Sequence, residues 1–162
     1  MIFITVGTEN FPFNRLLKAI DEAKASNQIK EEVFAQRGNS DYLPSNYDFA
    51  NFLDFYKELE YIKKADIVIT HAGTGSTFLT LSFGKIPIIF PRQKIYNEHL
   101  DDHQIEFTKK MQQQGKVLAA YNEKELIKVI KNYTELLAEL QPFSAGGDGE
   151  KILQYLRKIC SE

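Results

Sequence analysis

The residues best suited to chemistry in this sequence lie in a glycine-rich stretch, HAGTGST, that runs from His71 to Thr77. A β-branched run typical of a buried strand precedes the stretch, and an apolar helical pattern follows it. We expect Gly73 and Gly75 to take positive φ in a tight turn. Ser76 or Thr77 is expected to cap the helix. Because a helix N-terminus presents free N–H groups, the stretch predicts a cradle for phosphate; alternatively, the glycines only permit a tight connection.

A second group of polar side chains follows the next predicted strand, which runs from Ile88 to Phe90. After Pro91 the loop is rich in hydrogen-bonding residues, namely Arg92, Gln93, Asn97, Glu98, His99, Asp101, Asp102, His103 and Gln104. In an open parallel sheet, ligands bind at the edge formed by the carboxyl ends of the strands. Both loops leave that edge, so we expect them to face one crevice. The loop from Gly7 to Phe13 leaves the first strand and can line the same crevice.

The elements that must position these loops alternate along the chain between strands and helices. Strands are predicted at residues 2–6, 32–36, 47–52, 67–69, 88–90 and 117–120. Helices are predicted from Asn14, which can act as a cap, and at residues 54–64, 77–83, 101–113, 123–140 and 150–160. This alternation predicts an α/β, doubly wound parallel sheet in a single domain covering residues 1–162, with a flexible segment at about 141–149.

Composition and charge restrict the function classes that need to be considered. The 20 Lys and Arg against 22 Asp and Glu give a net charge of −2, so no nucleic-acid partner is expected. No apolar run approaches the roughly 20 residues of a membrane span, and no signal peptide is expected before the first strand. The single cysteine, Cys160, does not predict an internal disulfide.

Three motifs in order, ITHAGTGST, GKIPIIFPRQ and NEHLDDHQ, together with the opening MIFITVGTENFPFNRL, resemble one known family. The chain is similar to the donor-binding domain of glycosyltransferase family 28, and in particular to its small single-domain members. Those members include subunits of eukaryotic dolichol-linked and bacterial polysaccharide assembly systems. The resemblance covers most of residues 1–120 and implies the Rossmann-like, donor-binding half of a GT-B glycosyltransferase.

The resemblance implies the following roles for residues of this sequence. The glycine cradle holds the donor diphosphate, aided by Arg92 or Lys94, while Glu98 holds the ribose. In the lipid II enzyme of this family an acidic residue in the helix after the glycine turn holds the ribose, and the matching position here is near Leu79 and Thr80. The base is either Glu9 or a residue of the partner that binds the acceptor. The donor-binding residues expected are Gly7, Thr8, His71, Gly73, Thr74, Gly75, Ser76, Thr77, Arg92, Glu98, Asp102, His103 and Gln104, the last three for the sugar hydroxyls.

The resemblance also implies a UDP-sugar donor, inverting transfer without a cofactor or metal, and a lipid-linked glycan as acceptor in exopolysaccharide or capsule assembly. Since 162 residues supply one half of a two-domain transferase, a membrane-anchored subunit is expected to bind the acceptor. The chain would then be cytoplasmic and peripheral at the inner face of the membrane.

Other functions fit parts of the sequence. Glu98 and His99, together with Asp101, Asp102 and His103, suggest a metal site, but no cysteine supports it. Ser76, His71 and Asp102 suggest a hydrolase triad, although the chain lacks the G-x-S-x-G elbow. A non-catalytic subunit that binds a sugar nucleotide and stimulates a separate transferase is the main rival. A sugar-nucleotide epimerase on the same fold is a third interpretation.

Overall fold

Six parallel strands form one sheet in the order β3-β2-β1-β4-β5-β6. The structure is a computed structural model that describes residues 1–140. Its strands are β1 (Ile2–Thr5), β2 (Val33–Gln36), β3 (Asp48–Ala50), β4 (Ile67–Thr70), β5 (Ile88–Ile89) and β6 (Leu118–Ala119). Its helices are α1 (Asn14–Ala25), α2 (Phe55–Lys64), α3 (Thr74–Ser82), the 3-10 helix η1 (Lys94–Tyr96), α4 (His103–Gln113), α5 (Glu123–Lys131) and α6 (Tyr133–Glu139).

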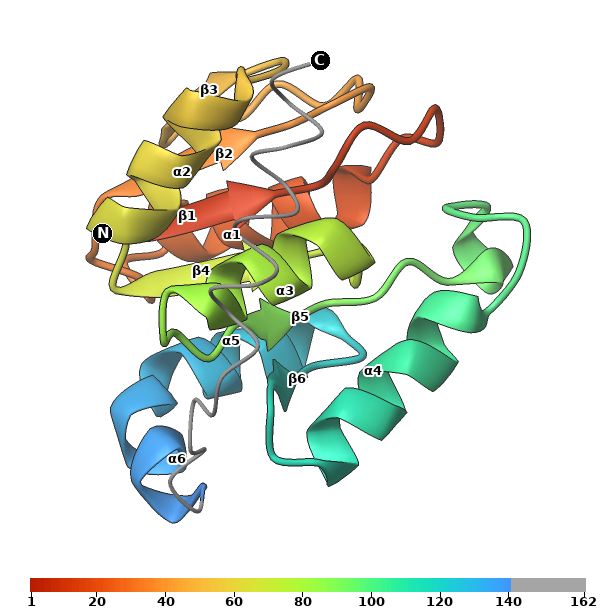
Figure 1. Ribbon diagram of the computed structural model, residues 1–162. Helices are drawn as coiled ribbons and strands as arrows, with labels where there is room; N and C mark the ends of the chain where they lie inside the picture. Colours follow the sequence, from red (N-terminus) through yellow and green to blue (C-terminus); the bar gives the residue numbers. More distant parts are fainter. Residues whose placement is uncertain (141–162) are drawn as a thin grey trace.

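Helices cover both faces of the sheet, which confirms the predicted doubly wound α/β fold (Figure 1). Successive side chains of β1 point to opposite faces: Ile2 and Ile4 belong to the core under α1, α5 and α6, whereas Phe3 belongs to the core under α2 and α3. A third cluster joins α3, α4 and β5 around Ile89. Since every residue of β1 and β4 is buried, the centre of the sheet is a rigid base for the loops at its edge.

The turn between β4 and α3 differs from the sequence prediction. The cap of α3 is Gly73 at φ −64°, without a side-chain hydrogen bond, and Gly75 lies inside the helix. Positive φ falls on Ala72 instead, at 69°. The predictions of positive φ for the two glycines and of a Ser76 or Thr77 cap were therefore wrong.

Three other element boundaries also differ. Phe13, not Asn14, is the cap of α1, because the Asn14 side chain accepts a hydrogen bond from the N–H of Tyr42 (3.1 Å). The single helix predicted over residues 123–140 is broken at Asn132, between α5 and α6. At the start of α6, the Tyr133 hydroxyl donates a hydrogen bond to the Ile86 carbonyl oxygen (2.7 Å), which holds this end of the helix in place. Helix α4 begins at His103 rather than at Asp101. The predicted segment 141–149 and helix 150–160 lie outside the described residues.

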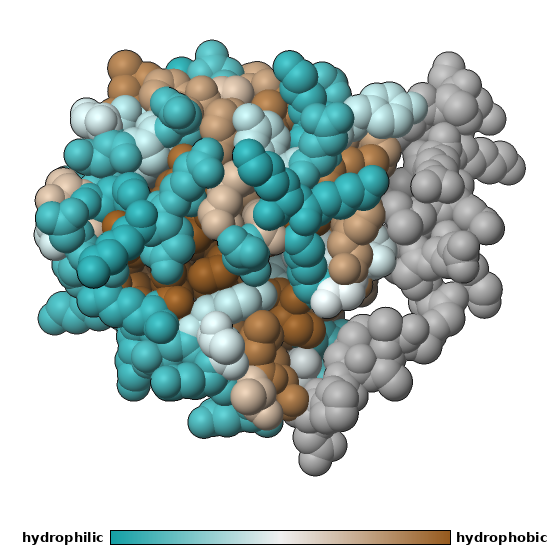
Figure 2. Space-filling model, turned by 90° about the vertical axis from the view of Figure 1, so that its left-hand side faces the viewer, coloured by the Kyte–Doolittle hydropathy of each residue, from teal (hydrophilic) through white to brown (hydrophobic). Residues whose placement is uncertain are grey.

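The side of the molecule at the left of Figure 1, away from the tip of the β1 arrow, is covered mainly by hydrophilic side chains, with apolar residues in hollows between them (Figure 2). Within residues 1–140, no helix combines the length and apolar character that a membrane span requires.

Candidate functional site

A pocket of about 360 Å³ lies where the loops after β1 and β4 meet helix α2. It is lined by Gly7, Thr8, Glu9, Gln36, Phe55, Glu58, His71, Gly73, Thr74, Gly75, Ser76 and Leu79. The first loop and the glycine turn come together because β1 and β4 are paired neighbours in register. The crevice at the carboxyl edge of the sheet therefore joins the loop after β1 to the glycine turn, as predicted. The prediction that the polar loop after β5 faces the same crevice has no support, because no residue of that loop lines the pocket.

His71 is a buried member of this pocket, 5% exposed. Its Nδ1 lies 3.3 Å from the Thr5 carbonyl oxygen, which can only accept, so Nδ1 carries the proton and Nε2 is left as an acceptor. Burial, followed by the positive charge of Arg92, lowers the pKa of His71 to about 4. The imidazole is therefore neutral at neutral pH.

Glycine is required on both sides of the His71 ring. A Cβ added at Gly7 would lie 2.6 Å from Nε2 of His71, and one added at Gly73 would lie 2.6 Å from Cε1. Gly7 also has φ of +73°, where other residues are strained. By contrast, a Cβ at Gly75 would meet no atom within 4 Å. Gly7 and Gly73 are therefore required by packing against the His71 ring, whereas Gly75 borders open space.

The N-terminus of α3 borders the pocket with backbone N–H groups. The Thr77 N–H donates to the Gly73 carbonyl (3.0 Å) and makes the first hydrogen bond of the helix. The N–H groups of the three preceding residues, Thr74, Gly75 and Ser76, therefore have no acceptor within the helix. All three residues line the pocket. Free N–H groups and the positive end of the helix dipole favour a bound phosphate group.

Helix α2 contributes two pocket residues that the sequence analysis did not identify. Phe55 and Glu58 are three positions apart, hence neighbours on one helix face, and both line the pocket. The Thr5 hydroxyl donates to Oε1 of Glu58 at 3.3 Å. Burial raises the pKa of Glu58. The signal available in the sequence was the position of this acid beside Phe55, on the face expected to point inward.

Arg92 has its guanidinium inside the protein rather than in the pocket. It is 1% exposed and donates to the carbonyl oxygens of Val6 (2.9 Å) and Phe11 (2.7 Å). Burial lowers the pKa of Arg92 to about 10, so it is charged at neutral pH. Arg92 thus fastens the loop after β1 to the loop after β5, which fixes the position of Thr8 and Glu9. Its predicted contact with a diphosphate stays a prediction, and this geometry gives it no support.

Glu98 is also engaged within the protein. It is 4% exposed, and both carboxylate oxygens accept hydrogen bonds from Arg15, each at 2.8 Å. Oε2 also accepts from the N–H of Gln93 (3.0 Å). A contact between Glu98 and a ribose would require this bidentate pair to open, so the predicted ribose role has no free oxygen to support it here.

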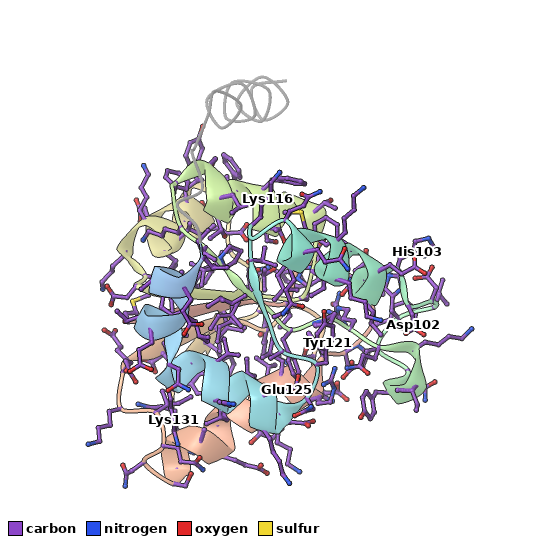
Figure 3. The ribbon with its side chains drawn as sticks, turned by 90° about the horizontal axis from the view of Figure 1, so that it is seen from below. Asp102, His103, Lys116, Tyr121, Glu125 and Lys131 are labelled. Carbon is purple, nitrogen blue, oxygen red and sulfur yellow. The ribbon has the colours of Figure 1, made fainter. Side chains whose placement is uncertain are left out.

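The remaining predicted residues lie around the start of α4, apart from the pocket lining. Oε1 of Gln104 accepts from the Arg92 N–H (3.0 Å), and Oδ1 of Asp102 accepts from the Lys94 N–H (3.0 Å). Asp102 and His103 lie side by side at the outer end of α4 (Figure 3). His103 is exposed and paired with Asp101 (2.9 Å), whose hydrogen bond raises the pKa of His103. Thr77 is fully buried and points away from solvent.

No three His, Cys, Asp or Glu side chains of residues 1–140 gather as a group that could hold a metal ion. A larger hollow of about 620 Å³ lies between α1 and α5, lined by Lys124, Lys128 and Lys131 among others. It is built from helix surfaces and lies away from the carboxyl edge of the sheet.

Two solved structures of glycosyltransferases share this fold. The glycotransferase of kitacinnamycin superposes with a TM-score of 0.51 at 17% identity, covering 97% of this chain and 43% of that one. CalG4, the calicheamicin glycosyltransferase, superposes with a TM-score of 0.57 at 13% identity, covering 98% and 43%. These likenesses concern the fold: a Rossmann-like α/β domain of the GT-B glycosyltransferase type.

The family follows from a sequence match. The model of the glycosyltransferase family 28 C-terminal domain matches residues 1–146, and the chain belongs to this family. The human UDP-N-acetylglucosamine transferase subunit ALG13 is 30% identical over 123 residues, 70% of this chain and 10% of that protein. The subunit of the same name from Yarrowia lipolytica is 30% identical over 95 residues, 57% of this chain and 46% of that protein. The chain thus spans less than half the length of these relatives.

Proposed function

We propose that this chain binds a UDP-sugar and is the catalytic, donor-binding subunit of an inverting glycosyltransferase. The observation that carries the proposal is the start of α3, where three residues whose N–H groups have no acceptor within the helix line a pocket with open space at Gly75. Such groups hold a diphosphate without a metal ion. The family of the chain supports a nucleotide-sugar donor, and the relatives named as UDP-N-acetylglucosamine transferase subunits support UDP.

The chemistry of such a transfer needs a stabilised leaving diphosphate and a base for the acceptor hydroxyl. The amides of α3 would serve the first need as charge develops on the departing diphosphate. Glu9 is the proposed base, since it is exposed at the mouth of the pocket. His71, with a buried neutral ring, holds the turn in shape.

The acceptor side of the proposal rests on the relatives. Because they are named as subunits, we propose that this chain works with a membrane-anchored partner that binds a lipid-linked glycan acceptor. We place this chain in the cytoplasm, peripheral at the inner face of the membrane, in exopolysaccharide or capsule assembly. Co-expression with such a partner and transfer from UDP-sugars to a lipid-linked acceptor test this part. Full activity of the isolated chain would contradict it.

Calorimetry with UDP tests the donor site itself. Gly75→Val places a branched side chain in the open space where the diphosphate would lie, so we expect binding to be lost while circular dichroism shows a folded protein. Leu81→Val, in α3 but outside the pocket lining, tests whether a valine in this helix is harmful in itself. Normal UDP binding by Gly75→Val would overturn the assignment.

A second candidate is a non-catalytic subunit that binds the sugar nucleotide and stimulates a separate transferase. The lack of an acid near Leu79 and Thr80 favours it, because the lipid II enzyme has an acid at the matching position, whereas the apolar Leu79 lines the pocket here. Glu9→Gln in the assembled complex separates the two functions. Loss of transfer with UDP binding retained supports catalysis by this chain, whereas unchanged transfer supports the stimulating role.

A further inference from the structure

The carboxylate of Glu58 lines the pocket with little support from the protein. Among residues 1–140, its carboxylate accepts one hydrogen bond, which comes from the Thr5 hydroxyl and is long, at 3.3 Å. No ion pair to Glu58 occurs within residues 1–140. The side chain is only partly exposed, although it belongs to a helix whose other inward residues, such as Phe55, are apolar. The Glu58 carboxylate can therefore accept further hydrogen bonds from a ligand.

Burying a carboxylate without a cation or a full set of hydrogen bonds costs free energy. A leucine or methionine at this position on α2 would pack against Phe55 without that cost. The raised pKa of Glu58 records the same penalty, with burial as its main cause. Ionisable groups held in such an unfavourable state in a pocket are concentrated at functional sites.

The charge of Glu58 restricts the part of a ligand that it can contact. A carboxylate repels phosphate, so in a pocket whose α3 amides hold a diphosphate, Glu58 must face another part of the ligand. It requires hydrogen-bond donors, and two oxygens on one carbon match two neighbouring hydroxyl groups. In a nucleotide sugar held by its diphosphate, the ribose lies next to the phosphates on the nucleoside side. Its two hydroxyl groups are neighbours.

We propose that Glu58 accepts hydrogen bonds from the ribose hydroxyl groups of the bound nucleotide, and that Thr5 orients its carboxylate. The assignment rests on the proposed function, because it assumes that the pocket binds a nucleoside diphosphate. It places the ribose-binding acid on α2, whereas Glu98 is held by Arg15. It also accounts for Leu79 in the pocket, since the acid on α2 makes one on α3 unnecessary.

Calorimetry of the full chain with UDP, 2′-deoxy-UDP and 3′-deoxy-UDP tests the proposal. We expect Glu58→Gln to weaken UDP binding by about 10-fold or more, the range for a hydrogen bond to a charged group. Each deoxy analogue keeps one of the two neighbouring hydroxyl groups, so Glu58→Gln should weaken binding of either analogue less than it weakens binding of UDP, as a double-mutant cycle requires. Glu60→Gln is the matched control, because Glu60 is an exposed acid on the same helix and is not in the pocket lining.

Each result is decisive. Equal UDP binding by wild type and Glu58→Gln overturns the assignment but leaves the proposed function intact. A loss of equal size for UDP and both deoxy analogues also overturns it, because Glu58 then contacts something other than the ribose. If wild type binds no UDP, the proposed function fails and the assignment fails with it. Circular dichroism of Glu58→Gln should show a folded protein, since the change removes a buried charge.

Discussion

Gly73→Ala is expected to destabilise the protein through the buried ring of His71. The added Cβ would lie 2.6 Å from Cε1 of His71, far inside ordinary van der Waals contact. The ring has little room to retreat, because Nδ1 is held by the Thr5 carbonyl and Gly7 lies against the ring as well. Backbone φ is not the cause, since Gly73 has φ −64°.

The magnitude follows from two effects. Overpacking of a buried site costs about 1–3 kcal/mol. Alanine is also a poorer helix cap than glycine, which adds a few tenths of a kcal/mol up to about 1. The free energy of unfolding should therefore fall by about 2–3 kcal/mol, and the melting temperature by about 4–12 °C for a chain of this size.

Gly75→Ala is the matched control, because it makes the same chemical change two positions later in the same turn. Its Cβ would meet no atom within 4 Å, and alanine favours a helix over glycine by about 0.5–1 kcal/mol. Urea and thermal unfolding followed by circular dichroism should thus place Gly73→Ala below wild type and Gly75→Ala at or above it. Equal stability of the two variants would refute the proposed packing around His71.

Three further predictions concern ionisable groups. His71 has a pKa of about 4 in the folded state against an ordinary 6.5. The free energy of unfolding should therefore fall by up to about 3 kcal/mol as the pH drops from 6.5 towards 4, and His71→Gln should remove this dependence on pH. Burial raises the pKa of Glu58, so its ionised carboxylate destabilises the folded protein once the pH rises through that pKa. Glu58→Gln should therefore be more stable than wild type at pH 7 but not at pH 4. Glu98→Gln leaves Arg15 without its charged partner and should cost about 3 kcal/mol of stability, measured by urea unfolding, while UDP affinity is kept; a stable variant with weak UDP binding would restore the ribose role.

A sugar-binding role for Gln104 can be checked in the same way. Gln104→Ala should lower transfer by about 10-fold while UDP still binds, because a sugar contact adds nothing to the nucleotide alone. Equal loss of UDP affinity would mean that the change acts through the Arg92 N–H, to which Gln104 is bonded.

The order of elements and the pocket at the glycine turn could be predicted from the sequence, because both depend on local signals. A β-branched run, a glycine pair and an apolar helix follow one another within a few residues, and neighbouring strands bring the first loop beside them. The position of positive φ could not be predicted, since the requirement at Gly73 comes from contact with His71, and the turn then falls on Ala72.

Contacts between distant residues were out of reach for the same reason. Arg15 and Glu98 are 83 positions apart, and nothing near either residue indicates that they pair. Arg92 looks like an exposed cation in a polar loop, yet the carbonyl groups of the loop after β1 surround it in the fold. Glu58 lies beside Phe55 on the inward face of its helix, but its place in a pocket follows only once β1 and the glycine turn lie next to α2.

The central claim, that the N-terminus of α3 binds the diphosphate of a UDP-sugar, can be tested directly by nuclear magnetic resonance. UDP should shift the backbone amide signals of Thr74, Gly75 and Ser76 most strongly, and uridine without phosphates should not. Shifts confined to the hollow between α1 and α5, or amide signals of α3 that UDP leaves unchanged, would contradict the claim.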